Sequence, residues 1–142
     1  MTGSRDILLV EDNADDEFLT LRALRRSQLP APVILRDGAE ALAYLFGQAA
    51  GRDPAQLPAV ILLDLKLPKV DGLDVLRRIR ADARTRLVRV VVLTSSNEPQ
   101  DIQASYELGA DSFVRKPVEF ETYIEAVGLV GRYWAGLNEP PI

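Results

Sequence analysis

Apolar and polar positions alternate in blocks along the chain, and five short apolar runs are separated by segments with a helical period. The runs are DILLV, VILR, AVILL, VRVVVL and DSFVR, at residues 6–10, 33–36, 59–63, 88–93 and 111–115. Three of them are nearly continuous in valine, isoleucine and leucine, which is typical of strands covered on both faces. The pattern therefore predicts five short strands.

In the segments that follow these runs, apolar residues recur at intervals of three and four, so they share one face of a helix. These predicted apolar faces consist of Phe18, Leu21 and Leu24; Leu42, Leu45 and Phe46; Leu73, Leu76 and Ile79; Ile102 and Tyr106; and Phe120, Ile124, Val127 and Val130. Gly109 marks the end of the fourth helix, and Gly38 and Gly72 mark turns. Five strand–helix repeats predict an α/β fold with a parallel sheet that has helices on both faces.

The spacing of the repeats also predicts the domain organisation. Residues 1–130 are assigned to a single domain, and residues 131–142 to an extension of the last helix and a tail. One predicted loop is long, GQAAGRDPAQLPA at residues 47–59, with two prolines and two glycines before the third strand.

Polar side chains follow four of the five predicted strands. Glu11 and Asp12 follow the first run, Asp64 the third, Thr94 the fourth and Lys116 the fifth. Singly, each could be a helix cap, a turn residue or a solvated charge. In open parallel sheets, however, ligands bind at the carboxyl ends of the strands, and all of these residues are predicted to lie there. Together they indicate a functional site.

The residue types at this edge suit phosphoryl transfer to a carboxylate. Crowded carboxylates repel one another unless a cation joins them, and Mg²⁺ prefers such all-oxygen ligands. Asp64, at the centre, would attack phosphorus in line and become an acyl phosphate. Thr94 and Lys116 would then donate hydrogen bonds to phosphoryl oxygens.

Composition narrows the candidate functions further. The 142 residues include no cysteine and no histidine, which excludes Cys-based metal sites, Ser-His-Asp catalysis and a phosphohistidine on this chain. A phosphoryl donor would therefore be another chain or a small molecule. The net charge of −4 argues against a dedicated nucleic-acid binder. No apolar run approaches the roughly 20 residues of a membrane span, and no signal peptide is evident. We expect a cytoplasmic protein.

The motifs at the strand ends resemble the receiver domain of bacterial two-component response regulators. LLVEDN, LLDLKLPKVDG, VVLTSS and FVRKP occur in the order and spacing of that family, and the resemblance covers residues 5–130. It implies a doubly wound, flavodoxin-like (βα)5 fold with strand order 2-1-3-4-5. It also implies a phosphoacceptor protein, not an enzyme, that assists its own phosphotransfer and autodephosphorylation.

The resemblance further implies roles for the acidic residues. Asp64 matches the phosphoacceptor. Glu11 and Asp12 match the acidic pair that binds Mg²⁺, for which Mn²⁺ can substitute, with Asp12 as a direct ligand and Glu11 acting through water. Asp64 and the backbone carbonyl of Lys66 complete the implied metal ligands. The Lys66 side chain is a candidate for tuning the lifetime of the acyl phosphate, and so is Ser96.

The remaining implied roles concern the switch. Thr94 and Lys116 match the hydroxyl and the lysine that bind the phosphoryl group, and Phe113 matches the aromatic residue that changes rotamer as Thr94 moves. The peptide bond before Pro117 is expected to be cis. Phosphorylation would shift the population of a pre-existing conformation of the face formed by the fourth helix, fifth strand and fifth helix.

Three features resemble single-domain regulators partnered with bacterial phytochrome histidine kinases: the long loop, the LLDLKLPK motif and the extended last helix. The implied partners are a sensor histidine kinase, a downstream target or phosphorelay protein, and a second copy of the chain. Tyr133, Trp134 and Leu137 are the predicted dimer contacts, since aromatic residues are enriched in interface cores. The alternative is that these residues fold back on their own domain.

Two other functions fit parts of the pattern. A haloacid-dehalogenase-type phosphatase also uses a strand-end Asp and Mg²⁺, but it typically carries a second Asp two residues later, where this chain has Lys66. A phosphate sink or a degenerate receiver that binds partners without phosphate is the other alternative, and the full acidic site argues against the degenerate form.

Overall fold

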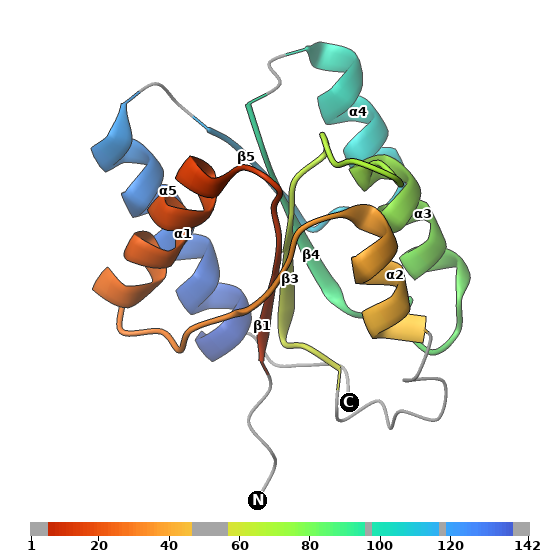
Figure 1. Cartoon of the computed structure of the whole chain (residues 1–142), viewed down its shortest axis with the longest axis horizontal. Coiled ribbons are helices and arrows are strands. Elements are labelled where there is room, and N and C mark those ends of the chain that lie inside the picture. Colours follow the sequence, from red (N-terminus) through yellow and green to blue (C-terminus); the bar gives the residue numbers. More distant parts are fainter. Residues whose placement is uncertain (1–5, 47–56, 96–97, 117–118, 138–142) are drawn as a thin grey trace, which may run out of the picture.

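The computed structural model describes residues 6–46, 57–95, 98–116 and 119–137, and its elements alternate as predicted (Figure 1). Ser96, Pro117 and most of the long loop lie outside the described residues. The elements, in chain order, are β1 (Ile7–Val10), α1 (Ala14–Arg26), β2 (Val33–Leu35), α2 (Gly38–Phe46), β3 (Val60–Leu63), α3 (Gly72–Ala81), β4 (Arg89–Thr94), α4 (Pro99–Glu107), β5 (Ser112–Arg115), α5 (Phe120–Arg132) and the π-helical turn η2 (Tyr133–Leu137).

The five strands form one parallel sheet in the order β2-β1-β3-β4-β5, which confirms the predicted fold. Helices α1 and α5 cover one face of the sheet, and α2, α3 and α4 cover the other (Figure 1). The strand order reverses beside β1, where Val10 pairs with Leu63 of β3. Ligands of such sheets bind at this reversal, so the ends of β1 and β3 form the expected crevice.

Burial explains why these segments are strands. Every residue of β1 and β3 is buried, and their side chains point alternately into two cores. Leu8 and Ile61 belong to the core under α2, α3 and α4, whereas Leu9 and Leu62 belong to the core under α1 and α5. Both faces of the central strands are therefore apolar. Among the described residues, no helix is long and apolar enough to cross a membrane.

The buried face of α1 differs from the prediction. Phe18 is 60% exposed, and Thr20, Ala23 and Leu24 are the buried residues of this helix. Asn13 caps the helix, which fixes where its first turn begins and turns the Thr20 side towards α5. The predicted place of Phe18 on the buried face is therefore wrong. Tyr106 of α4, also predicted to face inward, is 51% exposed.

The C-terminal extension packs on its own domain through Trp134. Its indole Nε1 donates a hydrogen bond to Ser112 Oγ at 3.1 Å, and the Arg89 guanidinium lies 5.4 Å from the ring centroid. Tyr133 stands edge-to-face against Trp134 and is 47% exposed. The side chain of Leu137 is not among the described parts of the chain. Trp134 therefore packs back on its own domain, as in the alternative to a dimer contact, whereas Tyr133 is exposed.

The loop between β3 and α3 is held against the turn before α2. The Gly38 amide donates to the Pro68 carbonyl at 3.3 Å, and a Cβ at Gly38 would collide with the Val70 carbonyl. Within this loop Lys69 has a φ of 71°, in the left-handed region that disfavours side chains with a Cβ. Its contact with Asp37, at 3.6 Å, is a largely exposed ion pair of little energetic value.

Lys69→Gly is therefore expected to stabilise the fold, by about 0.5–1 kcal/mol in the free energy of unfolding. Glycine removes the clash of the Cβ, and this gain exceeds the added flexibility of the unfolded chain. Urea denaturation measures the change. Lys69→Ala is the matched control, because it removes the same charge but keeps the Cβ; an equal stabilisation by both variants would contradict the explanation.

Candidate functional site

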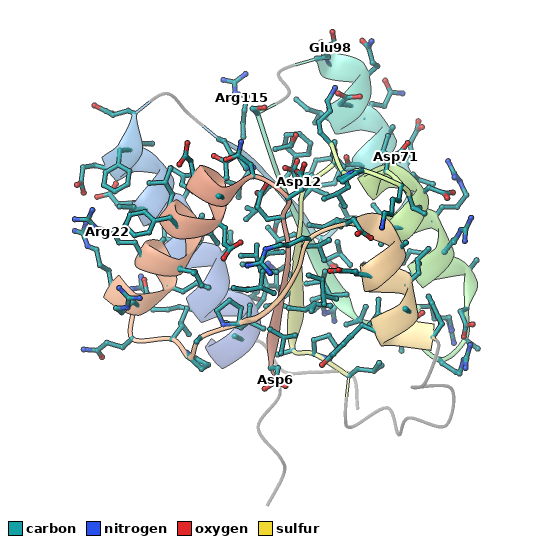
Figure 2. All side chains as sticks on the ribbon, in the orientation of Figure 1. Asp6, Asp12, Arg22, Asp71, Glu98 and Arg115 are labelled. Atoms are coloured by element: carbon teal, nitrogen blue, oxygen red, sulfur yellow. The ribbon has the colours of Figure 1, made fainter. Side chains whose placement is uncertain are left out.

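The polar residues predicted at the strand ends do meet at one edge of the sheet. Asp12, just beyond β1, lies at the upper end of the sheet in Figure 2, opposite Asp6 at the lower end. Asp64 follows β3, Thr94 ends β4, and Lys116 follows β5. The backbone joins these ends, because the Asp64 amide donates to the Val10 carbonyl at 3.1 Å and the Lys116 amide to the Thr94 carbonyl at 2.7 Å.

The ammonium group of Lys116 is the centre of the site. Its Nζ donates to Glu11 Oε1 at 2.7 Å, to Asp16 Oδ2 at 2.9 Å and to Asp64 Oδ2 at 3.2 Å. A lysine ammonium has three N–H donors, so each donor has a carboxylate partner. The Lys116 side chain is only 9% exposed, which strengthens these charged contacts relative to a surface ion pair.

The pKa values of Glu11 and Lys116 are both raised in the folded protein. Glu11 is 1% exposed, and this burial raises its pKa to about 8, although the hydrogen bond from Lys116 opposes the rise. Burial lowers the pKa of Lys116, but Asp64, Glu11 and Asp16 outweigh it and raise that pKa above its ordinary value. Lys116 therefore stays protonated, while Glu11 can hold a proton near neutral pH.

Asp64 has its two carboxylate oxygens in different environments. Oδ1 accepts a hydrogen bond from the Lys66 amide at 3.1 Å, in the loop after β3, and Oδ2 faces Lys116. The residue is 7% exposed. The loop amide fixes the orientation of the carboxylate, because a backbone donor two residues away closes a local turn. The side chain of Lys66 itself is exposed.

The acidic oxygens at this edge fit a hard divalent cation. Carboxylate oxygens of Glu11, Asp16 and Asp64 lie within 4.8 Å of one another. Asp12, the predicted direct ligand, is exposed and is not part of this group among the described residues. It lines a pocket of about 430 Å³ together with Lys66 and Asp71.

Sequence reasoning missed Asp16, which belongs to the site. The Asn13 side chain accepts a hydrogen bond from the Asp16 amide at 2.9 Å, so Asp16 is the third residue of α1. Helical side chains point back towards the helix N-terminus, which here brings Asp16 to the end of β1. The sequence spacing could have indicated this position. If Asn13 caps the helix, Asp16, three residues later, lies over the end of the strand.

The switch residues are placed as follows. Thr94 is fully buried at the end of β4. Phe113 of β5 is partly buried and packs against the core under α2, α3 and α4. Ser96 and the bond before Pro117 fall outside the described residues, so their predicted roles have no structural account.

A buried hydrogen bond ties the helix that carries Asp16 to its neighbour. Thr20 Oγ1 and the Tyr123 hydroxyl of α5 are 2.8 Å apart. Burial raises the pKa of Tyr123 to about 12, so the phenol remains neutral. Thr20 lies one turn beyond Asp16 on the same helix face, and this bond fixes α1 against α5 next to the site.

Comparison with known proteins gives a consistent picture. The family described as response regulator receiver domain matches residues 7–128. FilR2 of Methanothrix harundinacea, a probable methanogenesis regulatory protein, is 42% identical over 137 residues, covering 95% of this chain and 86% of that protein. The response regulator Rcp1 of Synechocystis is 37% identical over 129 residues, covering 90% of this chain and 87% of that protein.

Solved structures agree with the sequences. The phosphorylated cyanobacterial phytochrome response regulator RcpA has a TM-score of 0.84 at 36% identity, covering 97% of this chain and 99% of RcpA. The Mn²⁺-bound form of Rcp1 has a TM-score of 0.83 at 36% identity and covers 96% and 98% of the two chains. The bacteriophytochrome response regulator AtBRR is 54% identical with a TM-score of 0.71, covering 95% and 98%.

Proposed function

The chain belongs to the response regulator receiver domain family. We propose that its Asp64 accepts a phosphoryl group from a sensor histidine kinase. The observation that supports this most is the contact of Lys116 with both Asp64 and Glu11. It brings a nucleophile, an acidic ligand and a cation from three strands to one point. The overlap with RcpA, a phosphorylated phytochrome response regulator, supports the proposal.

In the proposed reaction an oxygen of Asp64 attacks phosphorus, an O–P bond forms, and the P–N bond to the donor histidine breaks. The bonding electron pair leaves with the donor nitrogen, and the other nitrogen of the donor ring carries a proton. The products are therefore an aspartyl phosphate and a neutral imidazole. A bound Mg²⁺, held by Glu11, Asp12, Asp64 and the Lys66 carbonyl, would supply positive charge to the transferred group. Lys116, which contacts Asp64, would supply a second positive charge.

The remaining residues would convert phosphorylation into a signal. Thr94 would donate its hydroxyl to a phosphoryl oxygen, and Phe113 would move inward as Thr94 shifts. The exposed side chain of Lys66, together with Ser96, would tune the rate of hydrolysis. The face formed by α4, β5 and α5 would present the result to a downstream protein or relay partner.

Incubation with phosphoramidate and Mg²⁺, followed by intact-mass analysis, tests the proposed reaction. We expect a base-labile addition of one phosphoryl group. Rapid release of phosphate with no detectable adduct would instead support a phosphatase, although the position of that enzyme's second Asp is occupied here by Lys66. The absence of any reaction would support a partner-binding module that works without phosphate.

We also propose that the kinase is a bacterial phytochrome. RcpA is a phytochrome response regulator and AtBRR a bacteriophytochrome response regulator, and both overlap nearly the whole chain. Radiolabelled phosphotransfer from a purified bacteriophytochrome kinase, compared with an unrelated histidine kinase, tests this pairing. Equal transfer from the two kinases would contradict it.

A homodimer is proposed on the outward side of α5 and η2. Tyr133 is 47% exposed and Leu129 is 60% exposed, whereas Trp134 is engaged within its own domain. Tyr133→Arg is therefore expected to raise the dimer dissociation constant about tenfold or more, since aromatic anchors dominate interfaces. Sedimentation equilibrium measures the change. Phe18→Arg is the matched control on α1, and equal weakening by both variants would contradict the assignment.

A further inference from the structure

We propose that Asp16 is a positioning residue that holds the Lys116 ammonium at the phosphorylation site while the other two carboxylates are occupied. The proposal rests on the proposed phosphotransfer to Asp64, and it assigns a role to a carboxylate outside the acidic pair Glu11 and Asp12. It starts from the geometry of Lys116, whose three donors are shared among Glu11, Asp16 and Asp64.

Two of these three contacts cannot persist unchanged through the reaction. Asp64 becomes an acyl phosphate, so its carboxylate charge is lost when the O–P bond forms. Glu11 is the buried acid beside Asp64 and belongs to the acidic pair, Glu11 and Asp12, that is proposed to hold the cation. Asp16 lies within 4.8 Å of Glu11 and Asp64 but stands outside that pair. With the cation on the proposed ligands, Asp16 is the contact of Lys116 that neither change removes, and its charge remains to hold one N–H of the ammonium.

The helix that carries Asp16 makes it a fixed partner. Asn13 caps the first turn by accepting from the Asp16 amide, so the backbone at Asp16 is held. One turn later the buried Thr20–Tyr123 hydrogen bond joins α1 to α5. Asp16 therefore cannot follow a lysine that swings away, and it restricts the Lys116 side chain to the mouth of the site.

The difference in exposure agrees with this role. The Asp16 side chain is 31% exposed and that of Lys116 is 9% exposed, so Asp16 approaches the ammonium from the solvent side. Glu11, at 1% exposed, approaches it from the interior. Loss of Asp16 would leave the outer side of the ammonium without its carboxylate, and the lysine would no longer be aimed at the incoming phosphoryl oxygens.

The first test is kinetic and uses phosphoramidate at saturating Mg²⁺. Asp16→Asn is expected to lower the maximal phosphorylation rate about tenfold without raising the phosphoramidate concentration needed for half of that rate. Removal of a negative charge does not weaken binding of an anionic donor, so the loss falls on the rate alone. Asp16→Glu is expected to restore the rate to within about threefold of wild type. Asp15→Asn, an exposed neighbour in the same turn, is the matched control.

The second test observes the ammonium group itself. A lysine ammonium held by carboxylates exchanges its protons slowly enough to give an ¹H–¹⁵N signal, and Lys116→Met identifies that signal. We expect it in wild type and in Asp15→Asn, both with EDTA and with Mg²⁺. In Asp16→Asn with Mg²⁺ we expect it to be lost. Circular dichroism and urea denaturation check that each variant is folded.

Three results would overturn the proposal. One is an Asp16→Asn variant that phosphorylates at the wild-type rate. Another is an Asp16→Asn variant that keeps the Lys116 signal with Mg²⁺. The third is a Mg²⁺ titration in which Asp16→Asn weakens binding as much as Asp12→Asn, because Asp16 would then be a metal ligand. If wild type forms no adduct at all, the proposed function fails instead, and the ammonium signal still decides whether Asp16 holds Lys116.

Discussion

Asp64→Asn is expected to abolish the base-labile phosphoryl adduct, whether the donor is phosphoramidate or a histidine kinase. An amide oxygen is a far weaker nucleophile than a carboxylate, and the neighbouring carboxylates Glu11 and Asp16 are both bonded to Lys116. A loss of about 10²-fold or more in the rate of adduct formation is expected. Intact-mass spectrometry with and without base treatment measures it.

The variant itself should fold, because Asn is nearly isosteric with Asp and keeps an oxygen for the hydrogen bond from the Lys66 amide. Asp71→Asn is the matched control: Asp71 is exposed, caps α3 with its side chain, and Asn caps equally well. We expect full labelling of this control. An adduct of wild-type yield on Asp64→Asn would show that another residue accepts the phosphoryl group.

Without divalent cations, the wild-type protein is expected to lose stability as the pH rises from about 5 to 8. Burial raises the pKa of Glu11 from 4.5 to about 8, so the folded chain binds this proton more tightly than the unfolded chain does. The stabilisation is complete below the unfolded pKa and is lost as the pH rises through the folded one. At about 1.4 kcal/mol per tenfold change in proton affinity, the loss is at most about 5 kcal/mol.

Urea denaturation at a series of pH values in EDTA measures this loss. Glu11→Gln is expected to flatten the curve, because glutamine is nearly isosteric and does not titrate, and Mg²⁺ is expected to restore stability at pH 8 by replacing the proton with a cation. Glu125→Gln, on the exposed part of α5, is the matched control and should leave the slope unchanged. An equal slope in the Glu11→Gln variant would show that another group binds the proton.

The apolar runs were sufficient to predict the fold. Each predicted strand matches an observed strand to within one residue at either end, because buried parallel strands require continuous runs of β-branched and aliphatic residues. The predicted meeting of Asp64 with Lys116 follows from the same topology, since parallel strands bring their carboxyl ends to one edge.

Helix faces were harder to predict from apolar spacing. Phe18 fits the apolar stripe of α1, yet α1 packs on α5 through Thr20, whose hydroxyl finds a partner in Tyr123. A hydrophobic pattern cannot predict the burial of polar residues that hydrogen-bond to each other between two helices. Asp16 was missed for a related reason. The run EDNADDE contains several acidic residues, and which of them reaches Lys116 depends on where the helix begins, which the Asn13 cap determines.

The packing of Trp134 gives the chain a built-in optical probe. It is the only tryptophan in the sequence, so the intrinsic indole emission comes from one environment. Its Nε1 bonds to Ser112, the residue before Phe113 in β5, and the Arg89 cation lies over its ring. Lys116 follows the other end of the same strand. A displacement of β5 relative to η2 alters the field around the indole, so stopped-flow fluorescence can follow the conformational response of this strand in real time without any label.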